Sequence, residues 1–126
     1  MNKRAKALDI SDKERKLVIE RQKGFSISGR SLSVYGCEIH HFRSRGCDGV
    51  GYEFNLVALT PEEHRAVHDK QPIYFSKCIR YTYQEFQTLM RNHLIRNYIN
   101  WTYDGCKYNK YYNDKEDYRI ARRQSK

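Results

Sequence analysis

The strongest constraint on how this chain folds is a helix start at Thr60. Thr60 can cap the helix with its hydroxyl, Pro61 suits the first turn, where no amide hydrogen is required, and Glu63 completes a Thr-x-x-Glu capping box. His64 and His68 follow at a spacing of one helical turn, so both lie on the same face of the helix. Two imidazoles placed in this way are a frequent part of a metal site, although such pairs also occur as ordinary surface or core histidines.

Two further histidines and an asparagine precede this helix. His40 and His41 are adjacent, and Asn55 stands between them and the helical pair. A divalent ion needs ligands that converge from several directions, which two histidines on one helix and a third on a distant strand supply. Each of these features is common by itself, whereas their joint occurrence in this order favours a metal site.

The same residues match the motif of the HNH endonucleases, also called ββα-metal or His-Me finger endonucleases, in type, order and approximate spacing. The resemblance implies an α+β fold with a β-hairpin followed by a helix, flanked by N-terminal and C-terminal helices. It places the histidine pair on the first strand and Asn55 on the second. As in the bacterial colicin DNases, which the motif resembles, one divalent metal ion would be held by His40, His64 and His68.

The resemblance also implies the catalytic roles. His41 would be the general base that takes a proton from the attacking water, a role suited to an imidazole that titrates near neutrality. Asn55 would hold the backbone around this base. The metal would stabilise negative charge on the phosphate and the leaving oxygen, and the sequence does not distinguish Mg, Mn, Ni and Zn. Because adjacent strand residues point to opposite faces, we expect a bend at His40 and His41.

A second resemblance, to small phage and prophage HNH proteins, begins at Ala5–Ile10 and a basic helix that ends before Gly24. In those proteins two Cys-x2-Cys pairs hold a structural zinc. The four cysteines correspond here to what we call the knuckle positions: Phe25, Ser28, Thr60 and Glu63. Because the whole ligand set is replaced, we expect no structural zinc at this place.

The cysteines that the chain does have are dispersed: Cys37, Cys47, Cys78 and Cys106. They form no Cys-x2-Cys, and we expect reduced thiols. A metal or disulfide role for Cys37 and Cys47, which flank the histidine pair, is the alternative.

The remaining pattern predicts a few elements. We expect a basic helix over residues 11–23 with Ser11 as its cap, a strand over residues 32–42, and an amphipathic helix from Tyr83 to Tyr98 that packs on the core and contains His93 as a structural residue. The last residues, 119–126, look frayed and basic.

The loop 43–51 is rich in glycine and carries Arg43 and Arg45. Glycine lets the backbone approach a ligand closely, and the two arginines are expected to bind nucleic acid by clamping phosphates near the metal. The alternative is that both arginines are ordinary solvent-exposed charges without a role in binding. The tyrosines and lysines after Trp101 could similarly stack on the bases of a single strand, or simply cover a small core.

Length and charge agree with a nucleic-acid partner. The 126 residues suffice for a single HNH domain, with its core at about residues 32–70 and a C-terminal helix and Tyr/Lys-rich tail over residues 71–126. A formal net charge of +9 favours a polyanion such as DNA. No apolar run is long enough to cross a bilayer, so we expect no membrane partner and a location in the cytoplasm of a bacterial host cell.

The predicted function is therefore metal-dependent hydrolysis of DNA phosphodiester bonds by a phage or prophage protein, acting as a homodimer or within a DNA-processing complex. The alternative is a DNA-binding protein or complex subunit that keeps the same set of histidines and asparagine but does not cleave DNA. In that case the histidines would hold a structural zinc, with a fourth ligand from Glu38, Cys37 or Asp69.

Overall fold

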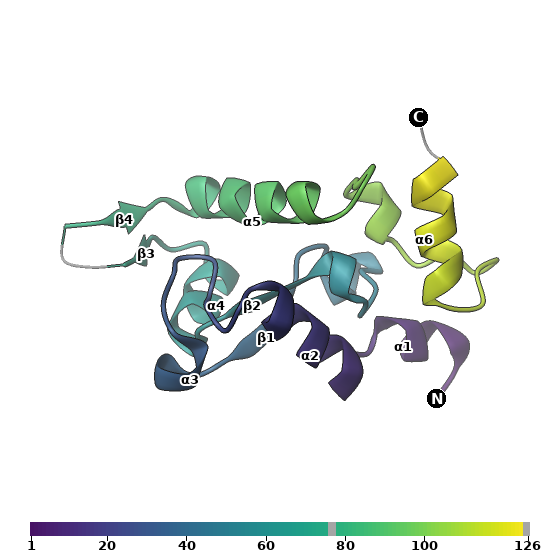
Figure 1. The fold of residues 1–126 in the computed structure, drawn as a ribbon, viewed down its shortest axis with the longest axis horizontal. Helices are drawn as coiled ribbons and strands as arrows, with labels where there is room; N and C mark the ends of the chain where they lie inside the picture. Colours follow the sequence, from purple (N-terminus) through teal and green to yellow (C-terminus); the bar gives the residue numbers. More distant parts are fainter. Residues whose placement is uncertain (76–77, 125–126) are drawn as a thin grey trace.

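The computed structural model describes residues 1–75 and 78–124 and shows a mixed α+β fold (Figure 1). Its elements follow in chain order: α1 (Lys3–Leu8), α2 (Asp12–Arg21), α3 (Leu32–Tyr35), β1 (Glu38–His41), η1 (Arg45–Cys47), η2 (Glu53–Asn55), β2 (Leu56–Leu59), α4 (Pro61–His68), β3 (Ile73–Tyr74), β4 (Arg80–Tyr81), α5 (Tyr83–Asn97), η3 (Asp104–Cys106) and α6 (Lys115–Gln124). Within the described ranges, no helix is both long enough and apolar enough to span a bilayer.

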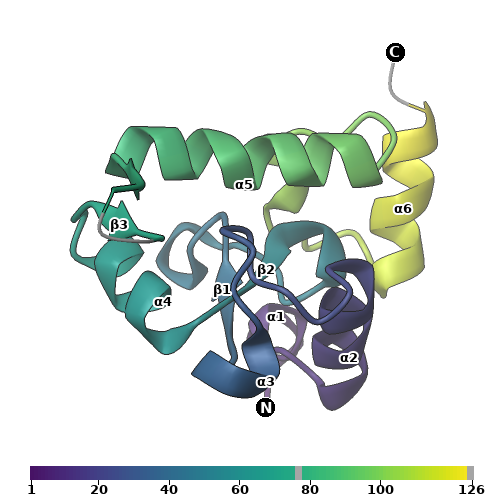
Figure 2. The ribbon, with the colours of Figure 1, turned by 60° about the vertical axis from the view of Figure 1, so that its left-hand side comes forward.

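The centre of the molecule is the antiparallel pair β1–β2. Its register joins Glu38 to Leu59 and His41 to Leu56, and β2 leads through Thr60 directly into α4. Figure 2 shows the pair between α4 on one side and α2 on the other, with α5 lying across them. The small pair β3–β4 lies at the opposite end of the molecule from α1 and α6 (Figure 1).

Three predicted helices are present with the expected local signals. The Ser11 hydroxyl accepts from the Glu14 amide at the start of α2, which ends at Arg21, two residues before the predicted end. The capping box of α4 is formed, and α5 begins with another, made by Thr82 and Glu85. These helices were predictable because caps act within one turn of the chain.

The strand predicted over residues 32–42 is wrong in its first half. Residues 32–35 form the short helix α3, and β1 begins only at Glu38. The Ser31 hydroxyl caps α3, and Gly36 ends it with a φ of 98°, a conformation that favours glycine. Val34 and Tyr35 are exposed, so burial does not support their preference for strands.

The prediction that residues 119–126 are frayed is wrong for residues 119–124, which belong to α6; residues 125–126 lie outside the described residues. Tyr118 and Arg122, one turn apart, are buried against the rest of the molecule. The Arg122 guanidinium lies over the Phe54 ring, 4.3 Å from its centroid. Contacts with a distant ring stabilise a helix whose own sequence is mostly charged.

The hydrophobic core joins both ends of the chain. One cluster extends from Leu8 in α1 to Tyr118 in α6 and includes Val57 and Leu59 of β2 and the buried side chains of α5. Tyr103, Tyr108 and Tyr112 pack against it, which confirms that much of the tyrosine-rich tail covers the core. A smaller cluster fills the space between α2, α3 and the other face of β1–β2.

Candidate functional site

Helix α4 presents its two histidines to the surface near β1. The capping box fixes its start: the Glu63 amide donates to Thr60 Oγ1 over 3.2 Å, and the Thr60 amide donates to Glu63 Oε1 over 2.9 Å. The His64 side chain is 30% exposed and the His68 side chain 86%. The helix therefore positions His64 firmly, whereas the ring of His68 extends into solvent.

His40 and Glu38 approach His64 from the neighbouring strand. The His40 and His64 rings lie 5.2 Å apart between centroids, at an angle of 71°. The Nδ1 atom of His64 lies 2.8 Å from Glu38 Oε1, and because a carboxylate can only accept, this nitrogen is the donor. Burial, reinforced by the nearby His64, His41 and His68, lowers the pKa of His40 to about 3. His40 is therefore a neutral imidazole at physiological pH.

A surface hollow of about 330 Å³ lies beside these residues and is lined by Glu38, Pro61, His64, Arg65 and His68. The structure thus brings the three predicted metal ligands into one neighbourhood. It does not align them as a finished site: among the described residues, no three His, Cys, Asp or Glu side chains are grouped closely enough to hold a metal ion. The Nδ1 atom of His68 instead lies 3.4 Å from Asp69 Oδ1.

His41 contacts the N-terminal helix. Its Nε2 atom lies 2.8 Å from the carbonyl oxygen of Leu8 at the end of α1. Since a carbonyl only accepts, Nε2 carries the proton and Nδ1 carries the lone pair. Burial lowers the pKa of His41, and the Leu8 carbonyl opposes part of that effect. The imidazole is therefore neutral near pH 7, with one nitrogen able to accept a proton.

The bend expected at His40 and His41 is not found. The pairing of β1 with β2 is regular through His40–Val57 and His41–Leu56, and the Phe42 amide continues it to the Asn55 carbonyl over 2.8 Å. Regular pairing places adjacent side chains on opposite faces of the hairpin. His40 accordingly faces α4, and His41 faces α1.

Asn55 holds the loop that follows His41, as predicted. Its side chain is fully buried; Oδ1 accepts from the Arg43 amide over 2.7 Å, and Nδ2 donates to the carbonyls of Arg43 and Val50 over 3.0 and 2.8 Å. These three bonds clamp both ends of the loop 43–50 to the start of β2. The catalytic importance of this clamp remains a prediction.

Two glycines of this loop lie close to other parts of the backbone. A Cβ atom on Gly49 would lie 1.7 Å from the carbonyl oxygen of Arg43, so only glycine fits. The amide of Gly49 donates to the carbonyl of Ser44 over 2.9 Å. Gly49 thus approaches the loop's own backbone, whereas a Cβ atom on Gly51 would lie 2.1 Å from the carbonyl oxygen of Asp9, directly after α1.

The two loop arginines differ in their surroundings. The Arg43 side chain is 13% exposed; it lies over the Tyr103 ring at 4.6 Å, donates to the Cys47 carbonyl over 2.8 Å and faces Asp104 at 3.5 Å. Arg45 is 48% exposed and pairs with Asp9 over 2.6 Å. Arg43 is thus used in holding the fold, and Arg45 is the more accessible cation.

The knuckle positions meet in space although they hold no cysteine. Ser28 and Ser26 both donate to Glu63 Oε2, Ser26 over 3.3 Å, and Glu63 is joined to Thr60 by the capping box. Glu63 and Thr60 are each 1% exposed and Ser26 is 6% exposed. A buried hydrogen-bonded cluster therefore links three of the four positions, while Phe25 remains 50% exposed.

Two further expectations concern residues outside the site. His93 lies on α5, where its Nε2 accepts from Arg21 Nε over 2.9 Å, so it is a structural histidine as predicted. Within residues 1–75 and 78–124 no two cysteines form a disulfide.

The contact of His41 with Leu8 was not predicted, because every residue has a backbone carbonyl and the sequence carries no signal for this one.

Comparisons with known proteins do not assign the chain to a family. A scan against models of protein families, a search of curated proteins and a search of solved structures each found no match.

Proposed function

We propose that this chain is a metal-dependent DNA endonuclease of the HNH type, in which His40, His64 and His68 hold one divalent ion and His41 is the general base. The observation that carries the proposal is the hairpin β1–β2 leading into α4, which brings the rings of His40 and His64 to 5.2 Å and places His68 one turn further along. A hairpin followed directly by a helix is the order of elements that the motif implies.

The chemistry of the donors fits a divalent metal. His40 is neutral, so its lone pair is available without loss of a proton. The bond from His64 Nδ1 to Glu38 leaves Nε2 as the ligand atom, and a carboxylate behind a ligating histidine is a common way to orient the ring and raise its basicity. Completing the set requires a change in the side-chain conformation of His68, whose exposure permits it.

His41 has the properties that a general base requires. Its protonated nitrogen is held by the Leu8 carbonyl, and its other nitrogen is free to take the proton of a water that attacks the phosphate. The metal, when bound, supplies a Lewis acid for the developing charge. Asn55 keeps the backbone directly after His41 in place through its bonds to Arg43 and Val50.

The cluster at the knuckle positions supports kinship with the small phage and prophage proteins. The knuckle positions form two pairs, Phe25 with Ser28 and Thr60 with Glu63, and a hydrogen bond between Ser28 and Glu63 joins the two pairs across 35 residues. If these positions once held zinc, the bond between Ser28 and Glu63 now connects them in its place.

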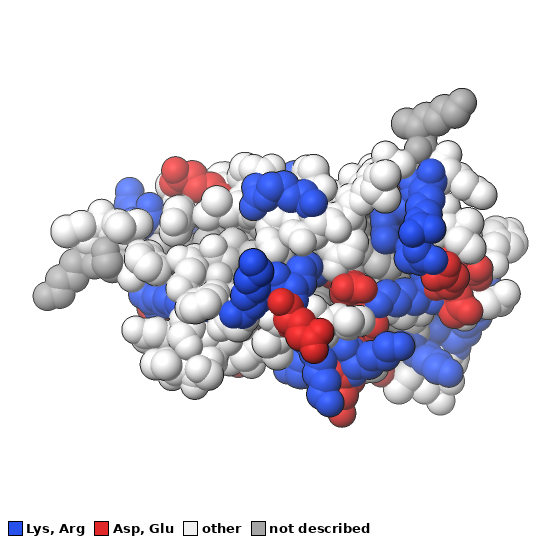
Figure 3. Space-filling view, viewed as in Figure 1, with Lys and Arg blue, Asp and Glu red and all other residues white. Residues whose placement is uncertain are grey.

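The charge distribution supports DNA as the substrate. On the face seen in Figure 3, Lys and Arg side chains gather over α2, α5 and α6, with acidic side chains between them. The exposed cations of these three helices include Lys13 and Lys16 on α2, Arg91 and Arg96 on α5, and Arg123 on α6. Such a surface attracts a polyanion from a distance and binds it in a salt-dependent manner.

The test is cleavage of supercoiled plasmid by the purified chain with magnesium, manganese, nickel or zinc in turn, beside an EDTA control. We expect metal-dependent nicking that is lost in His41→Ala and in His64→Ala. His93→Gln is the matched control, because it changes a histidine outside the site and retains an acceptor for Arg21. Full activity of His41→Ala would refute the assigned base, and no cleavage with any metal would refute the nuclease.

A non-cleaving DNA-binding protein is the second candidate, favoured by the position of His41 on the opposite face of β1 from His40. In that version Glu38 would join the histidines as the fourth ligand of a structural zinc. One tightly held zinc per chain, together with plasmid binding and no turnover, would support this candidate against the nuclease.

A further inference from the structure

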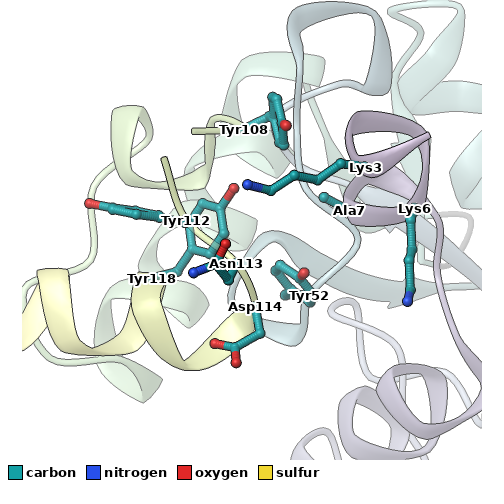
Figure 4. Close-up of a pocket in the computed structure, with 9 residues that line it drawn as sticks. All are labelled: Lys3, Lys6, Ala7, Tyr52, Tyr108, Tyr112, Asn113, Asp114 and Tyr118. Carbon is teal, nitrogen blue, oxygen red and sulfur yellow. The ribbon is translucent and has the colours of Figure 1, made fainter. Parts of the chain in front are cut away.

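A second cavity, of about 450 Å³, lies between α1 and the C-terminal segment, away from the histidines. Its lining comes from both ends of the chain (Figure 4): Lys3, Lys6, Ala7, Tyr52, Tyr108, Tyr112, Asn113, Asp114 and Tyr118. The volume falls within the range of about 300–1,000 Å³ that small-molecule sites occupy. We call it the tyrosine pocket.

The aromatic wall of the tyrosine pocket is held rigidly. The ring of Tyr118 lies 4.7 Å from that of Tyr112 at an angle of 87°, and 5.5 Å from that of Tyr52. The hydroxyl of Tyr118 accepts from the Asn109 amide over 2.9 Å. Tyr108 is tied to the loop after β1, since its amide donates to the Asp48 carbonyl over 2.7 Å. A rigid aromatic surface loses little entropy when a planar ligand stacks on it.

Two ammonium groups accompany these rings. In Figure 4 the Lys3 side chain reaches across the pocket between Tyr108 and Tyr52, and Lys6 points away at the rim. The amine of Lys3 donates to the Lys110 carbonyl over 2.8 Å, which leaves further hydrogens for an anion. With Asp114 as the one acidic residue of the lining, the pocket carries a net positive charge.

We propose that the tyrosine pocket binds one nucleotide of a single-stranded nucleic acid, with the base against the tyrosine rings and its phosphate on Lys3. Aromatic rings beside a cation are the combination by which proteins hold unpaired nucleotides. A base inside a duplex is already stacked on its neighbours and cannot enter such a cavity. The inference deepens the proposed function and rests on it for the identity of the strand as substrate.

Helix α1 connects the tyrosine pocket to the candidate catalytic site. Lys3 and Ala7 line the pocket, and the next residue, Leu8, provides the carbonyl that holds His41. The carbonyl of Ala7 also accepts from the Gly51 amide over 2.9 Å. A strand bound in the pocket is therefore held by the same short helix that orients the proposed base.

The experiment is a fluorescence-anisotropy titration of labelled oligo-dT and oligo-U in EDTA, so that neither metal nor cleavage is involved. We expect Tyr108→Ala to weaken binding about tenfold and Tyr108→Phe to retain it, because stacking needs the ring and not the hydroxyl. Lys3→Gln should reduce the slope of log affinity against log salt by about 0.7. The oligo-dT and oligo-U arms distinguish DNA from RNA as the source of the nucleotide.

The controls are chosen from outside the pocket. Tyr111→Ala removes a tyrosine that is 79% exposed, and Arg80→Gln removes an exposed cation on β4, at the opposite end of the molecule; neither should change the affinity or the slope as the pocket variants do. Absence of binding by the unmodified chain, equal effects of Tyr108→Ala and Tyr111→Ala, or an unchanged slope in Lys3→Gln would overturn the proposal. Strand binding by the unmodified chain, together with no plasmid cleavage with any metal, would refute the nuclease alone. Plasmid cleavage without strand binding would refute the pocket alone.

Discussion

Replacing Asn55 by alanine tests how the loop after His41 is held. The substitution removes three hydrogen bonds from a fully buried side chain: one accepted from the Arg43 amide and two donated to the carbonyls of Arg43 and Val50. The three backbone groups then lose their partner within the protein. Since a buried polar group without a partner costs about 1–3 kcal/mol, the loss is far larger than that of an exposed asparagine.

The expected loss in the free energy of unfolding is about 3–4 kcal/mol. Three groups at about 1 kcal/mol or slightly more each give this value, because water can reach part of the space that the amide leaves. A domain is commonly stable by about 5–15 kcal/mol, so Asn55→Ala should still fold. It should be much less stable and have a looser loop 43–50.

Urea unfolding measures this loss directly. Trp101 is the only tryptophan, is 8% exposed and donates to the Phe54 carbonyl over 2.6 Å, so its fluorescence reports on the core next to Asn55. Asn113→Ala is the control, because its side chain is exposed and should change stability by no more than about 0.5 kcal/mol. A loss for Asn55→Ala of less than about 1 kcal/mol would refute the clamp.

Asn55→Asp separates the hydrogen-bond argument from simple cavity formation. A carboxylate there would face the two carbonyl oxygens that Nδ2 now serves, so its pKa in the folded state would exceed the value of about 3.9 in the unfolded state. The folded state then binds more protons, and stability falls as the pH rises above about 4. Relative to the unmodified chain, the variant should lose more stability at pH 7 than at pH 4; an equal loss at both would contradict the bonding scheme.

Three further predictions concern residues around the site. Burial, followed by Arg21 and Arg96, lowers the pKa of His93 to about 4. As the pH falls from about 6.5 toward 4, the unfolded chain therefore binds a proton at His93 before the folded chain does, and the folded state loses stability. In urea unfolding, the unmodified chain should lose about 1 kcal/mol more than His93→Gln between pH 7 and pH 5, a value reduced for the partial exposure of the ring. Placing cysteine at all four knuckle positions should create a site for one zinc ion, seen by metal titration and a higher Tm with zinc than with EDTA, and failure to bind zinc would remove the support that these positions give to the family resemblance. Arg45→Gln should weaken duplex binding in a gel-shift titration more than Arg43→Gln does, because Arg45 is the more exposed cation. Arg43→Gln should instead cost about 1–2 kcal/mol of stability. A larger loss of binding in Arg43→Gln and a larger loss of stability in Arg45→Gln would contradict the different surroundings of the two side chains.

Features that depend on a few neighbouring residues were predictable from the sequence. The capping box at Thr60 and Glu63 and the cap at Ser11 both formed, because a hydroxyl and an amide within one turn meet whatever surrounds them. The helix predicted from Tyr83 by its amphipathic spacing begins at that residue, where a capping box of Thr82 and Glu85 starts it. The spacing of His64 and His68 likewise needed only helical geometry to place both on one face.

Features that depend on distant partners were not predictable. Residues 32–35 have side chains that favour a strand, yet no strand of the described part of the chain pairs with them, and the Ser31 cap starts a helix there. Helix α6 has a mostly charged sequence, and it is stabilised by burial of Tyr118 and Arg122 against rings from elsewhere in the chain. The arginines of the loop looked alike in sequence, and only Tyr103 and Asp104, about sixty residues away, distinguish Arg43 from Arg45.

The sequence by itself determined the local frame: a capped helix with two histidines on one face, a histidine pair before it, and an asparagine between them. The tertiary structure alone decided how these groups face one another. It set the 5.2 Å between the rings of His40 and His64, the bond of His64 to Glu38 and the bond of His41 to the Leu8 carbonyl. The physical reason is range: capping and helical periodicity act within one turn of the chain, whereas a contact across 33 residues is set by how the whole core packs.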